Sequence, residues 1–400
     1  MINTEFSPWP SFSMEEVEAV KEVILSGKVN SWTGEHCHLF ETEFAKWTGS
    51  NYAVALANGS LALEASLRAV GVGVGDEVIT TPRTFIATAS SVVLVGGIPV
   101  FADVDRNSQN ITAESIARVI SSKTKAIIVV HLAGMPADMD PIMELAQQYD
   151  LKVIEDCAQA HGAQYKGRSV GTIGDVGAWS FCQDKIMTTG GEGGMVTTND
   201  EQLWSSVWSY KDHGKNHDTV YKRIHPQGFR WLHESFGSNW RMTEMQAVIG
   251  RIQLKKVDQW REQRHKNCLA IDSSVSQNGL VRCVQVPEDM VHGHYKHYLF
   301  VRPEKLSRNW SRDRIISELR LQGVLCHQGS CPEVYMEKAF AGRFRPANRL
   351  PIAQELGETG LMFLVHPTLK SGEIDKMCHA LSEVMSCALQ NYVQPRKREA

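Results

Sequence analysis

The chain is organised around residues 179–195, which read Trp-Ser-Phe-Cys-Gln-Asp-Lys-Ile-Met-Thr-Thr-Gly-Gly-Glu-Gly-Gly-Met. They place one lysine, Lys185, between a short apolar segment and a turn that holds four glycines within residues 190–194. Glycine removes the Cβ atom where a backbone turns tightly or approaches a ligand. Taken alone, the segment fits a lysine at the edge of a hairpin turn. The functional hypothesis is an amine that attacks a carbonyl to form a Schiff base, and it depends on the rest of the chain.

Upstream of this lysine, the first strand signal is the apolar run Tyr52–Ala57, which is followed by Asn58 and a helix-period segment over residues 61–70. Asn58 is a good N-cap for that helix. The N–H groups of Gly59 and Ser60 then lie at the positive end of the helix, where a phosphate can bind. An Asn-Gly turn with a good cap explains the same residues without a ligand.

Strand and helix patterns alternate from here to the lysine. Strands are predicted at residues 78–81, 99–104, 126–131 and 152–155, and helices at 86–95, 113–120 and 140–149. This alternation predicts a mostly parallel sheet with helices on both faces. Ligands of such sheets bind at the carboxyl ends of the strands. Phe85, His131 and Asp156 follow predicted strands, so we expect them to converge on one crevice with the turn at residues 59–60.

The flanking regions suggest a second, smaller domain. Two helices, at residues 14–25 and 38–47, precede the sheet, and a polar and aromatic connection over residues 211–238 is long enough to indicate a functional or interface loop. One helix over residues 241–266 is predicted to connect the domains. Beyond it, a strand at 298–301, an apolar segment at 361–365 and helices at 312–322 and 373–389 are typical of an α+β domain. We expect a large domain at 1–250, a smaller one at 251–390 and a tail at 391–400.

Composition narrows the classes of function. The chain is 42% hydrophobic and 22% charged, and its net charge of -3 gives no general attraction to nucleic acid or to an anionic membrane. The nine cysteines include no Cys-x-x-Cys pair, which favours neither a disulfide framework nor a zinc site and fits a reducing cytoplasm. The first ten residues lack a basic and an apolar region, and no apolar run reaches the length of a membrane span, so we expect neither export nor membrane insertion. We therefore expect a cytoplasmic protein without metal, nucleic-acid or membrane partners.

The candidate residues together suit pyridoxal 5'-phosphate (PLP). A lysine forms the Schiff base, an aspartate keeps the pyridine nitrogen protonated, and a helix N-terminus holds the phosphate. The order along the chain is residues 58–60, Phe85, Asp156 and Lys185. Neither Gly-x-Gly-x-x-Gly after the first strand nor Gly-x-x-x-x-Gly-Lys-Ser/Thr occurs, so dinucleotide and ATP binding lack their usual motifs.

Ordered blocks over nearly the whole chain carry a resemblance to a known family. These blocks are Ala57-Asn-Gly-Ser-Leu-Ala-Leu63, Gly75-Asp-Glu-Val-Ile79, Phe101-Ala-Asp-Val104, His131-Leu-Ala-Gly-Met-Pro-Ala-Asp-Met139, Glu155-Asp-Cys-Ala-Gln-Ala-His-Gly162, Gly174-Asp-Val-Gly-Ala-Trp-Ser-Phe181, Gly191-Glu-Gly-Gly194 and Asn239-Trp-Arg-Met-Thr-Glu244. With them the chain resembles the DegT/DnrJ/EryC1/StrS sugar aminotransferases, which are PLP enzymes of the aspartate-aminotransferase (type I) fold.

The resemblance implies a role for each matching residue. Lys185 and Asp156 become the catalytic pair, Lys185 in the Schiff base with PLP and Asp156 on the pyridinium. The other implied cofactor contacts are ring stacking by Phe85, the 3-hydroxyl by Gln159, and the phosphate by Gly59, Ser60, Ser180 and, from the second subunit of a homodimer, Asn239. Candidate substrate contacts in or near matching blocks are His161, His213, His327 and Tyr335, although ordinary polar roles fit these four as well.

Three positions depart from the family pattern without removing a required group. Ser60 stands where Thr is frequent, Cys157 where Ala is common, and Cys182 where an aromatic residue or His is frequent. Related dehydratases replace the lysine with histidine, so retention of Lys185 favours amino transfer.

The closer resemblance is to bacterial nucleotide-sugar 4-aminotransferases. It implies transfer of an amino group from glutamate to the C-4 keto group of a UDP-linked 6-deoxy sugar, with or without a 2-acetamido group, for lipopolysaccharide, O-antigen or another surface glycan. Two alternatives stay open. One is amination at C-3 of a dTDP-linked 3-keto sugar, and the other is a PLP-binding regulatory protein without turnover.

Overall fold

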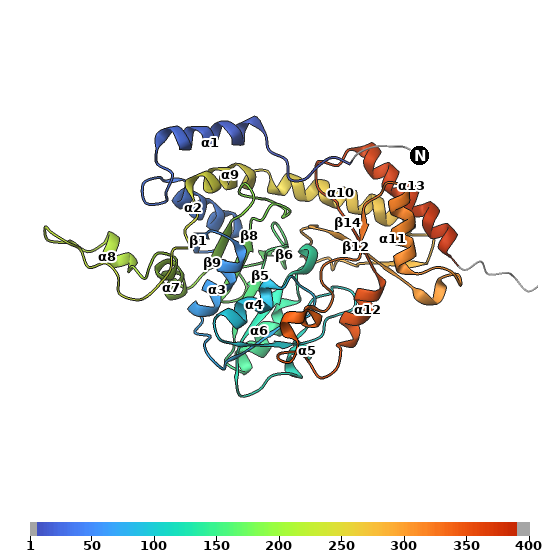
Figure 1. Ribbon diagram of the computed structural model, residues 1–400, viewed down its shortest axis with the longest axis horizontal. Helices are drawn as coiled ribbons and strands as arrows, with labels where there is room; N and C mark the ends of the chain where they lie inside the picture. Colours follow the sequence, from blue (N-terminus) through green and yellow to red (C-terminus); the bar gives the residue numbers. More distant parts are fainter. Residues whose placement is uncertain (1–5, 390–400) are drawn as a thin grey trace, which may run out of the picture.

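A seven-stranded sheet forms the centre of the computed structural model, which describes residues 6–389 (Figure 1). The strand order is β1-β9-β8-β5-β4-β2-β3. The pairs from β8 to β3 are parallel, while β9 runs antiparallel to both β1 and β8. The predicted mostly parallel α/β sheet is confirmed. The strands are β1 (Tyr52–Leu56), β2 (Glu77–Thr80), β3 (Ile98–Phe101), β4 (Thr124–Val130), β5 (Lys152–Asp156), β8 (Val176–Ser180) and β9 (Gly194–Thr198).

Helices cover both faces of this sheet because successive side chains of a strand point in opposite directions. In β1, Val54 packs with the helices of one face and Ala55 with those of the other. The first face is covered by α3 (Gly59–Ala69), α4 (Ala87–Leu94) and α7 (Glu201–Lys211). The second is covered by α2 (His36–Thr48), α5 (Ala113–Ala117), α6 (Met139–Gln148) and α9 (Glu244–Leu254).

The helix ends follow the predicted signals. Asn58 Oδ1 accepts a hydrogen bond from the N–H of Leu61 at 3.0 Å, so Asn58 caps α3 as expected. The helix α1 (Met14–Ser26) stops at Gly27, whose φ of +68° is the left-handed conformation that glycine adopts without strain.

The predicted single helix over residues 241–266 is wrong. The structure has two helices, α9 and α10 (Val257–Val275), with a break at Lys255 and Lys256. Figure 1 shows them following one another, with α9 below α1 and α10 continuing toward the C-terminal part. The break lets α9 pack closely on α2 while α10 packs in the C-terminal core, and Lys256 Nζ contacts Glu16 Oε1 of α1 at 2.9 Å. Neither glycine nor proline marks the break, so the residue pattern could not show it.

The C-terminal part is built on an antiparallel four-stranded sheet in the order β10-β12-β14-β13. Its strands are β10 (Val281–Cys283), β12 (His297–Val301), β13 (Cys326–His327) and β14 (Gly360–Phe363). Its helices are α11 (Arg312–Leu321), α12 (Pro351–Thr359) and α13 (Ser371–Ala388). Short 3-10 helices occur at η1 (Leu132–Gly134), η2 (Pro303–Lys305), η3 (Val334–Met336) and η4 (Lys338–Phe340).

Two sets of contacts join parts of the chain on either side of the predicted domain boundary at residue 250. A third sheet pairs β11 (Met290–Val291) with the hairpin β6 (Gln164–Tyr165) and β7 (Arg168–Ser169). At the other end of the chain, Phe6 packs against the C-terminal core, although the predicted division assigns it to the large domain. The predicted tail, 391–400, lies outside the described residues.

The long connection over residues 211–238 carries one short helix, α8 (His217–Tyr221), and projects from the left of the molecule as an arm (Figure 1). Large apolar side chains on this arm are exposed, with Phe236 fully so. Across residues 6–389, no helix combines the length and the apolar character needed to cross a bilayer. All nine cysteines lie within residues 6–389, and none of them forms a disulfide.

Candidate active site

A cavity of about 820 Å³ opens where the carboxyl ends of β1, β5 and β8 meet the N-terminus of α3. It brings together residues that are up to 306 positions apart, from Asn58 to Leu364. The predicted site residues that line it are Gly59, Ser60, Phe85, Asp156, Gln159, Ser180, Lys185 and His327. The convergence expected from the strand ends is therefore present for Phe85, Asp156 and the turn at residues 59–60, whereas His131 is buried and does not line the cavity.

One end of the cavity is formed by the first turn of α3. The N–H groups of Gly59 and Ser60 lie in that turn, where a helix offers them no internal acceptor. A Cβ atom on Gly59 would come within 2.5 Å of the Cβ of Ser180, and one on Gly194 within 2.3 Å of the carbonyl oxygen of Asn58. Glycine at both positions lets three backbone segments approach closely. The result is a cradle of backbone donors at a positive helix end, which fits a phosphate.

Asp156 ends β5 at the cavity and is 5% exposed. Its Oδ2 accepts a hydrogen bond from Thr88 Oγ1 at 2.8 Å, and its Oδ1 accepts one from the N–H of Ala158 at 3.2 Å. Burial raises the pKa of Asp156, whereas these two hydrogen bonds and the charge of Lys185 act against that rise. A buried carboxylate in this position favours a cation beside it. The pyridinium nitrogen of PLP is such a cation.

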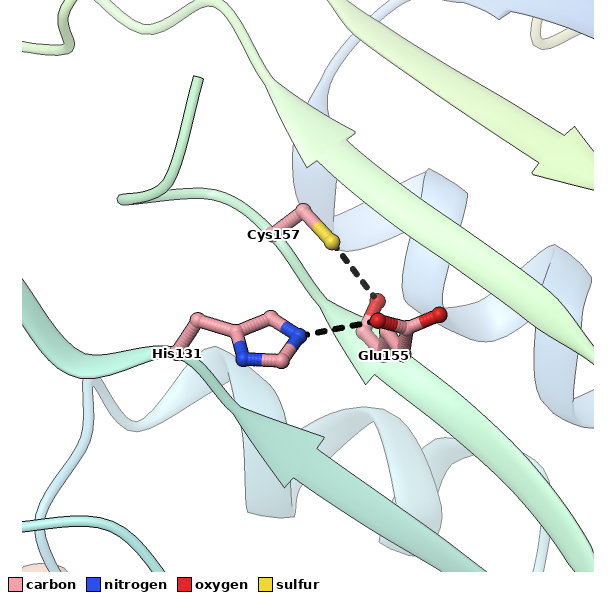
Figure 2. A group of neighbouring side chains, drawn as sticks. All are labelled: His131, Glu155 and Cys157. Atoms are coloured by element: carbon pink, nitrogen blue, oxygen red, sulfur yellow. Dashed lines mark hydrogen bonds and ion pairs between the residues drawn. The ribbon is translucent and has the colours of Figure 1, made fainter. Parts of the chain in front are cut away.

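A buried cluster of His131, Glu155 and Cys157 lies at the ends of β4 and β5 (Figure 2). His131 Nε2 contacts Glu155 Oε2 at 3.0 Å, and His131 Nδ1 accepts the N–H of Ala137 at 3.0 Å. The thiol of Cys157 points to the carbonyl oxygen of Glu155 at 3.7 Å. The carboxylate of Glu155 also accepts the N–H groups of Gly171, Ile173 and Gly174.

The atoms of His131, Glu155 and Cys157 that could hold a metal ion lie within 4.8 Å of one another. Both ring nitrogens of the histidine are already used, however, and both oxygens of the carboxylate accept backbone N–H groups. The cluster is therefore a hydrogen-bonded brace for the carboxyl ends of β4 and β5, next to Asp156.

Lys185 is fixed through its backbone. Its N–H donates to the carbonyl of Cys182 at 3.0 Å, and its own carbonyl accepts the indole N–H of Trp9 at 2.9 Å. Its Nζ lies 5.0 Å from the centre of the Tyr295 ring. The glycine-rich turn that follows has φ angles of +85° at Gly190 and +122° at Gly191. These angles explain the glycines of the sequence as turn residues that position the lysine loop.

Two further cavity residues complete the group. Gln159 Oε1 accepts the N–H of Ala133 at 2.8 Å, which leaves Nε2 as the donor at the cavity. Phe85 is 65% exposed although it belongs to the cavity wall, so its ring can stack on a planar ligand. An amine, a buried carboxylate, an anion cradle and an aromatic ring together fit PLP.

Four predicted site residues do not reach the cavity. His161 is fully buried between Trp179 and Phe181, where burial lowers the pKa of its ring to about 3. Tyr335 is also buried, with its hydroxyl bonded to Glu333. The other two, His213 and Asn239, are exposed at the base of the arm, outside the cavity of their own chain.

The structure adds residues that the sequence did not single out. Tyr295 donates its hydroxyl hydrogen to Asp184 Oδ2, and Lys296 Nζ lies 3.7 Å from the same oxygen. Thr88 holds Asp156 as described above. Asp184 is next to the lysine in sequence, but no sequence signal links Tyr295 and Lys296 to a lysine more than a hundred residues away.

Comparison with known proteins agrees with this geometry. Residues 10–382 match the DegT/DnrJ/EryC1/StrS aminotransferase family. The chain is 33% identical to the GDP-perosamine synthase of Escherichia coli O157:H7 over 94% of this chain and 97% of that protein. It is 34% identical to the UDP-N-acetyl-3-dehydro-alpha-D-glucosamine 3-aminotransferase of Acidithiobacillus ferrooxidans, over 88% and 89% of the two chains. An aminotransferase from Psychrobacter cryohalolentis, solved by X-ray crystallography, is 58% identical with a TM-score of 0.95, over 96% of this chain and all of that one.

Fold and site thus define a PLP-dependent aminotransferase that acts on nucleotide-linked sugars. The chain belongs to the DegT/DnrJ/EryC1/StrS aminotransferase family.

Proposed function

We propose that the enzyme takes an amino group from glutamate and transfers it to the C-4 keto group of a UDP-linked 6-deoxy sugar. A 2-acetamido sugar for a bacterial surface glycan is the substrate we favour. The observation that carries the proposal is the joint presence of Lys185, Asp156 and the α3 N-terminus in one cavity. The UDP and acetamido groups are supported by the 3-aminotransferase relative, whose name contains both.

PLP supplies the electron sink that stabilises negative charge at the reacting carbon. We propose that Lys185 would hold it and that Lys185 Nζ, once free, would accept a proton from the reacting carbon. The carboxylate of Asp156 keeps the ring nitrogen protonated. Gly59, Ser60 and Ser180 bind the phosphate, Phe85 stacks on the ring, and Gln159 donates to the 3-hydroxyl. His327 lines the cavity on the C-terminal side, where we place the sugar.

We also propose a homodimer with shared active sites. Asn239 is exposed and lies outside its own cavity, at the base of the arm. Four large apolar side chains of the arm are 77% exposed or more, namely Ile224, Phe229, Trp231 and Phe236. Such a concentration of exposed apolar residues indicates a protein interface. In a twofold dimer, the arm can cover the partner while Asn239 reaches the phosphate of the partner's site.

The test is amination of a panel of UDP-, dTDP- and GDP-linked 4-keto and 3-keto sugars with glutamate, with the product position read by NMR. We expect the UDP-linked 4-keto-6-deoxy sugar to be the preferred acceptor. Preference for a 3-keto sugar would support the second candidate, which the 3-aminotransferase relative favours. If glutamate fails to convert the absorbance of bound PLP, glutamate is not the amino donor.

A further inference from the structure

A second lysine, Lys296, lines the same cavity as Lys185. Its side chain is 15% exposed, and its Nζ lies 4.4 Å from the centre of the Tyr295 ring. Lys185 Nζ lies 5.0 Å from the centre of that ring. One aromatic ring therefore adjoins both amines.

Lys296 occupies a well-anchored segment. The N–H of Tyr295 donates to the carbonyl of Ala133 at 2.9 Å, and the guanidinium of buried Arg264 donates to the carbonyls of His294 and Tyr295. On the other side, His297 begins β12 and its Nε2 contacts Asp272 at 2.9 Å. Because residues on both sides are held, the backbone places Lys296 at the cavity before any ligand binds.

The ammonium group of Lys296 has N–H donors available for a ligand in the cavity. Its ion-pair distance of 3.7 Å to Asp184 Oδ2 is longer than a hydrogen bond, because that oxygen already accepts the hydroxyl of Tyr295. Within residues 6–389, Asp184 is the acidic residue that forms an ion pair with Lys296 Nζ, and this single long contact does not use all three N–H donors of the ammonium group. A charged group that is mostly buried and has unused donors at a cavity wall suits an anionic ligand.

The amino donor brings such an anion. An amino acid carries a carboxylate on the carbon that bears its amino group, and a carboxylate that enters an enclosed cavity needs a cation or several donors. Lys185 and Lys296 are the lysines of the cavity lining, and no arginine of the described chain belongs to it. Lys185 is committed to the cofactor in the proposed function. Burial lowers the pKa of His327 below its usual value, so this histidine is neutral near pH 7.

We propose that Lys296 binds the carboxylate of the amino donor beside Lys185. This inference rests on the proposed function. A nucleotide sugar also carries an anion, its diphosphate, but with reaction at C-4 the diphosphate lies across the sugar ring at C-1. The anion nearest the reacting nitrogen is then the donor carboxylate.

The charge of Lys296 depends on pH in the relevant range. Burial lowers the pKa of Lys296 to about 8, with Asp184 opposing the change and Arg264 and Lys185 adding to it. Tyr295, His327 and His366 are further titratable groups beside Lys296, and burial together with the charge of Lys296 lowers the pKa of both histidines. A bound carboxylate favours the charged form of the amine, so carboxylate binding weakens as pH rises above about 8.

The experiment measures binding of glutarate, a dicarboxylate without an amino group, to the PLP-loaded enzyme by calorimetry. We expect Lys296→Met to weaken glutarate binding by about tenfold or more, because a charge-assisted hydrogen bond is lost. The KM for glutamate should rise in parallel, while the KM for the nucleotide sugar stays within about twofold. Lys296→Arg should recover part of the affinity. Lys266→Met, at an exposed position of α10, serves as the matched control.

Glutarate affinity that is unchanged in Lys296→Met would overturn the inference. A raised KM for the nucleotide sugar with normal glutarate binding would show instead that the amine binds the diphosphate. If the variants fail to fold or to retain PLP, the test is the pH dependence of glutarate binding to the wild-type enzyme. We expect the affinity to fall between pH 7.5 and about 9.5. A constant affinity over this range contradicts the inference. Glutarate binding requires no sugar, so this outcome is separate from the choice of acceptor in the proposed function.

Discussion

Thr88 Oγ1 donates a hydrogen bond of 2.8 Å to Asp156 Oδ2, across the gap between α4 and the end of β5. The hydroxyl of Thr88 also pairs with that of Thr84 at 2.7 Å. This threonine pair makes the orientation of Asp156 depend on the first turn of α4. The orientation of the Asp156 carboxylate is therefore set by α4 as well as by β5.

Replacing Thr88 by Val tests this relationship. The variant keeps the shape of the side chain but loses the donor, so the pKa of Asp156 should rise further and the rate should fall by about tenfold. Asp156→Asn sets the upper limit, with an expected loss on the order of 10²-fold or more. Turnover and PLP retention are measured together. Ser90→Ala on the same helix is the control, and equal rates in Thr88→Val and wild type would show that the hydrogen bond has no functional role.

The attachment of PLP can be located chemically. Reduction of the enzyme with borohydride followed by peptide mass mapping should place the pyridoxyl group on Lys185, because this lysine shares the cavity with Asp156 and the α3 N-terminus. Lys185→Ala should retain PLP noncovalently, since the other contacts remain. A pyridoxyl group on Lys296, the other lysine of the cavity, would exchange the roles proposed for the two residues.

Shared active sites predict complementation between two inactive variants. In a mixed dimer of Lys185→Ala and Asn239→Arg, one site receives an intact lysine from one subunit and an intact asparagine from the other. Co-refolding an equal mixture should restore about a quarter of the wild-type activity if subunits pair at random. A monomeric sedimentation mass with full activity contradicts the shared site. So does a mixture as inactive as its separate components.

The buried brace predicts a pH effect on stability. Although burial raises the pKa of Glu155, the bonds from His131 and from backbone N–H groups outweigh it and leave the pKa below its usual value. A carboxylate with a lowered folded-state pKa stabilises the fold above its unfolded pKa, and this contribution is lost as pH falls through the folded-state pKa. We expect Glu155→Gln to lose about 1–3 kcal/mol of unfolding free energy at pH 7 and less at pH 4.

Denaturant unfolding at several pH values measures this effect, and Glu144→Gln on the exposed face of α6 is the control. An equal loss for Glu155→Gln at pH 4 and pH 7 would show that the charge of Glu155 does not stabilise the fold.

The sequence predicts the features that depend on local periodicity and on chain order. Alternation of strands and helices is enough to place Asp156 and the turn at Gly59 on the same sheet edge, and Asn58 is recognisable as a cap from its neighbours alone. These predictions succeed because a parallel sheet aligns the carboxyl ends of its strands.

Features that depend on long-range packing are not predictable in this way. The break at Lys255 follows from two different packing partners of α9 and α10. Lys296 reaches the cavity because Arg264 and Ala133 hold its segment, and no residue pattern near position 296 shows this. His161 lies in a matching block, but the aromatic residues of β8 and its following loop enclose it, so a matching motif does not by itself give access to the ligand.

The hydrogen bond from Trp9 to the carbonyl of Lys185 links the start of the chain to the centre of the site. The same segment is fastened at Ser7, whose N–H and hydroxyl both contact Glu373 of α13. Natural variation among residues 7–9 is therefore expected to change catalytic rate without any contact to substrate. An N-terminal extension or truncation that displaces Trp9 should therefore cause the same loss of activity in a genetic screen as a mutation in the lysine loop.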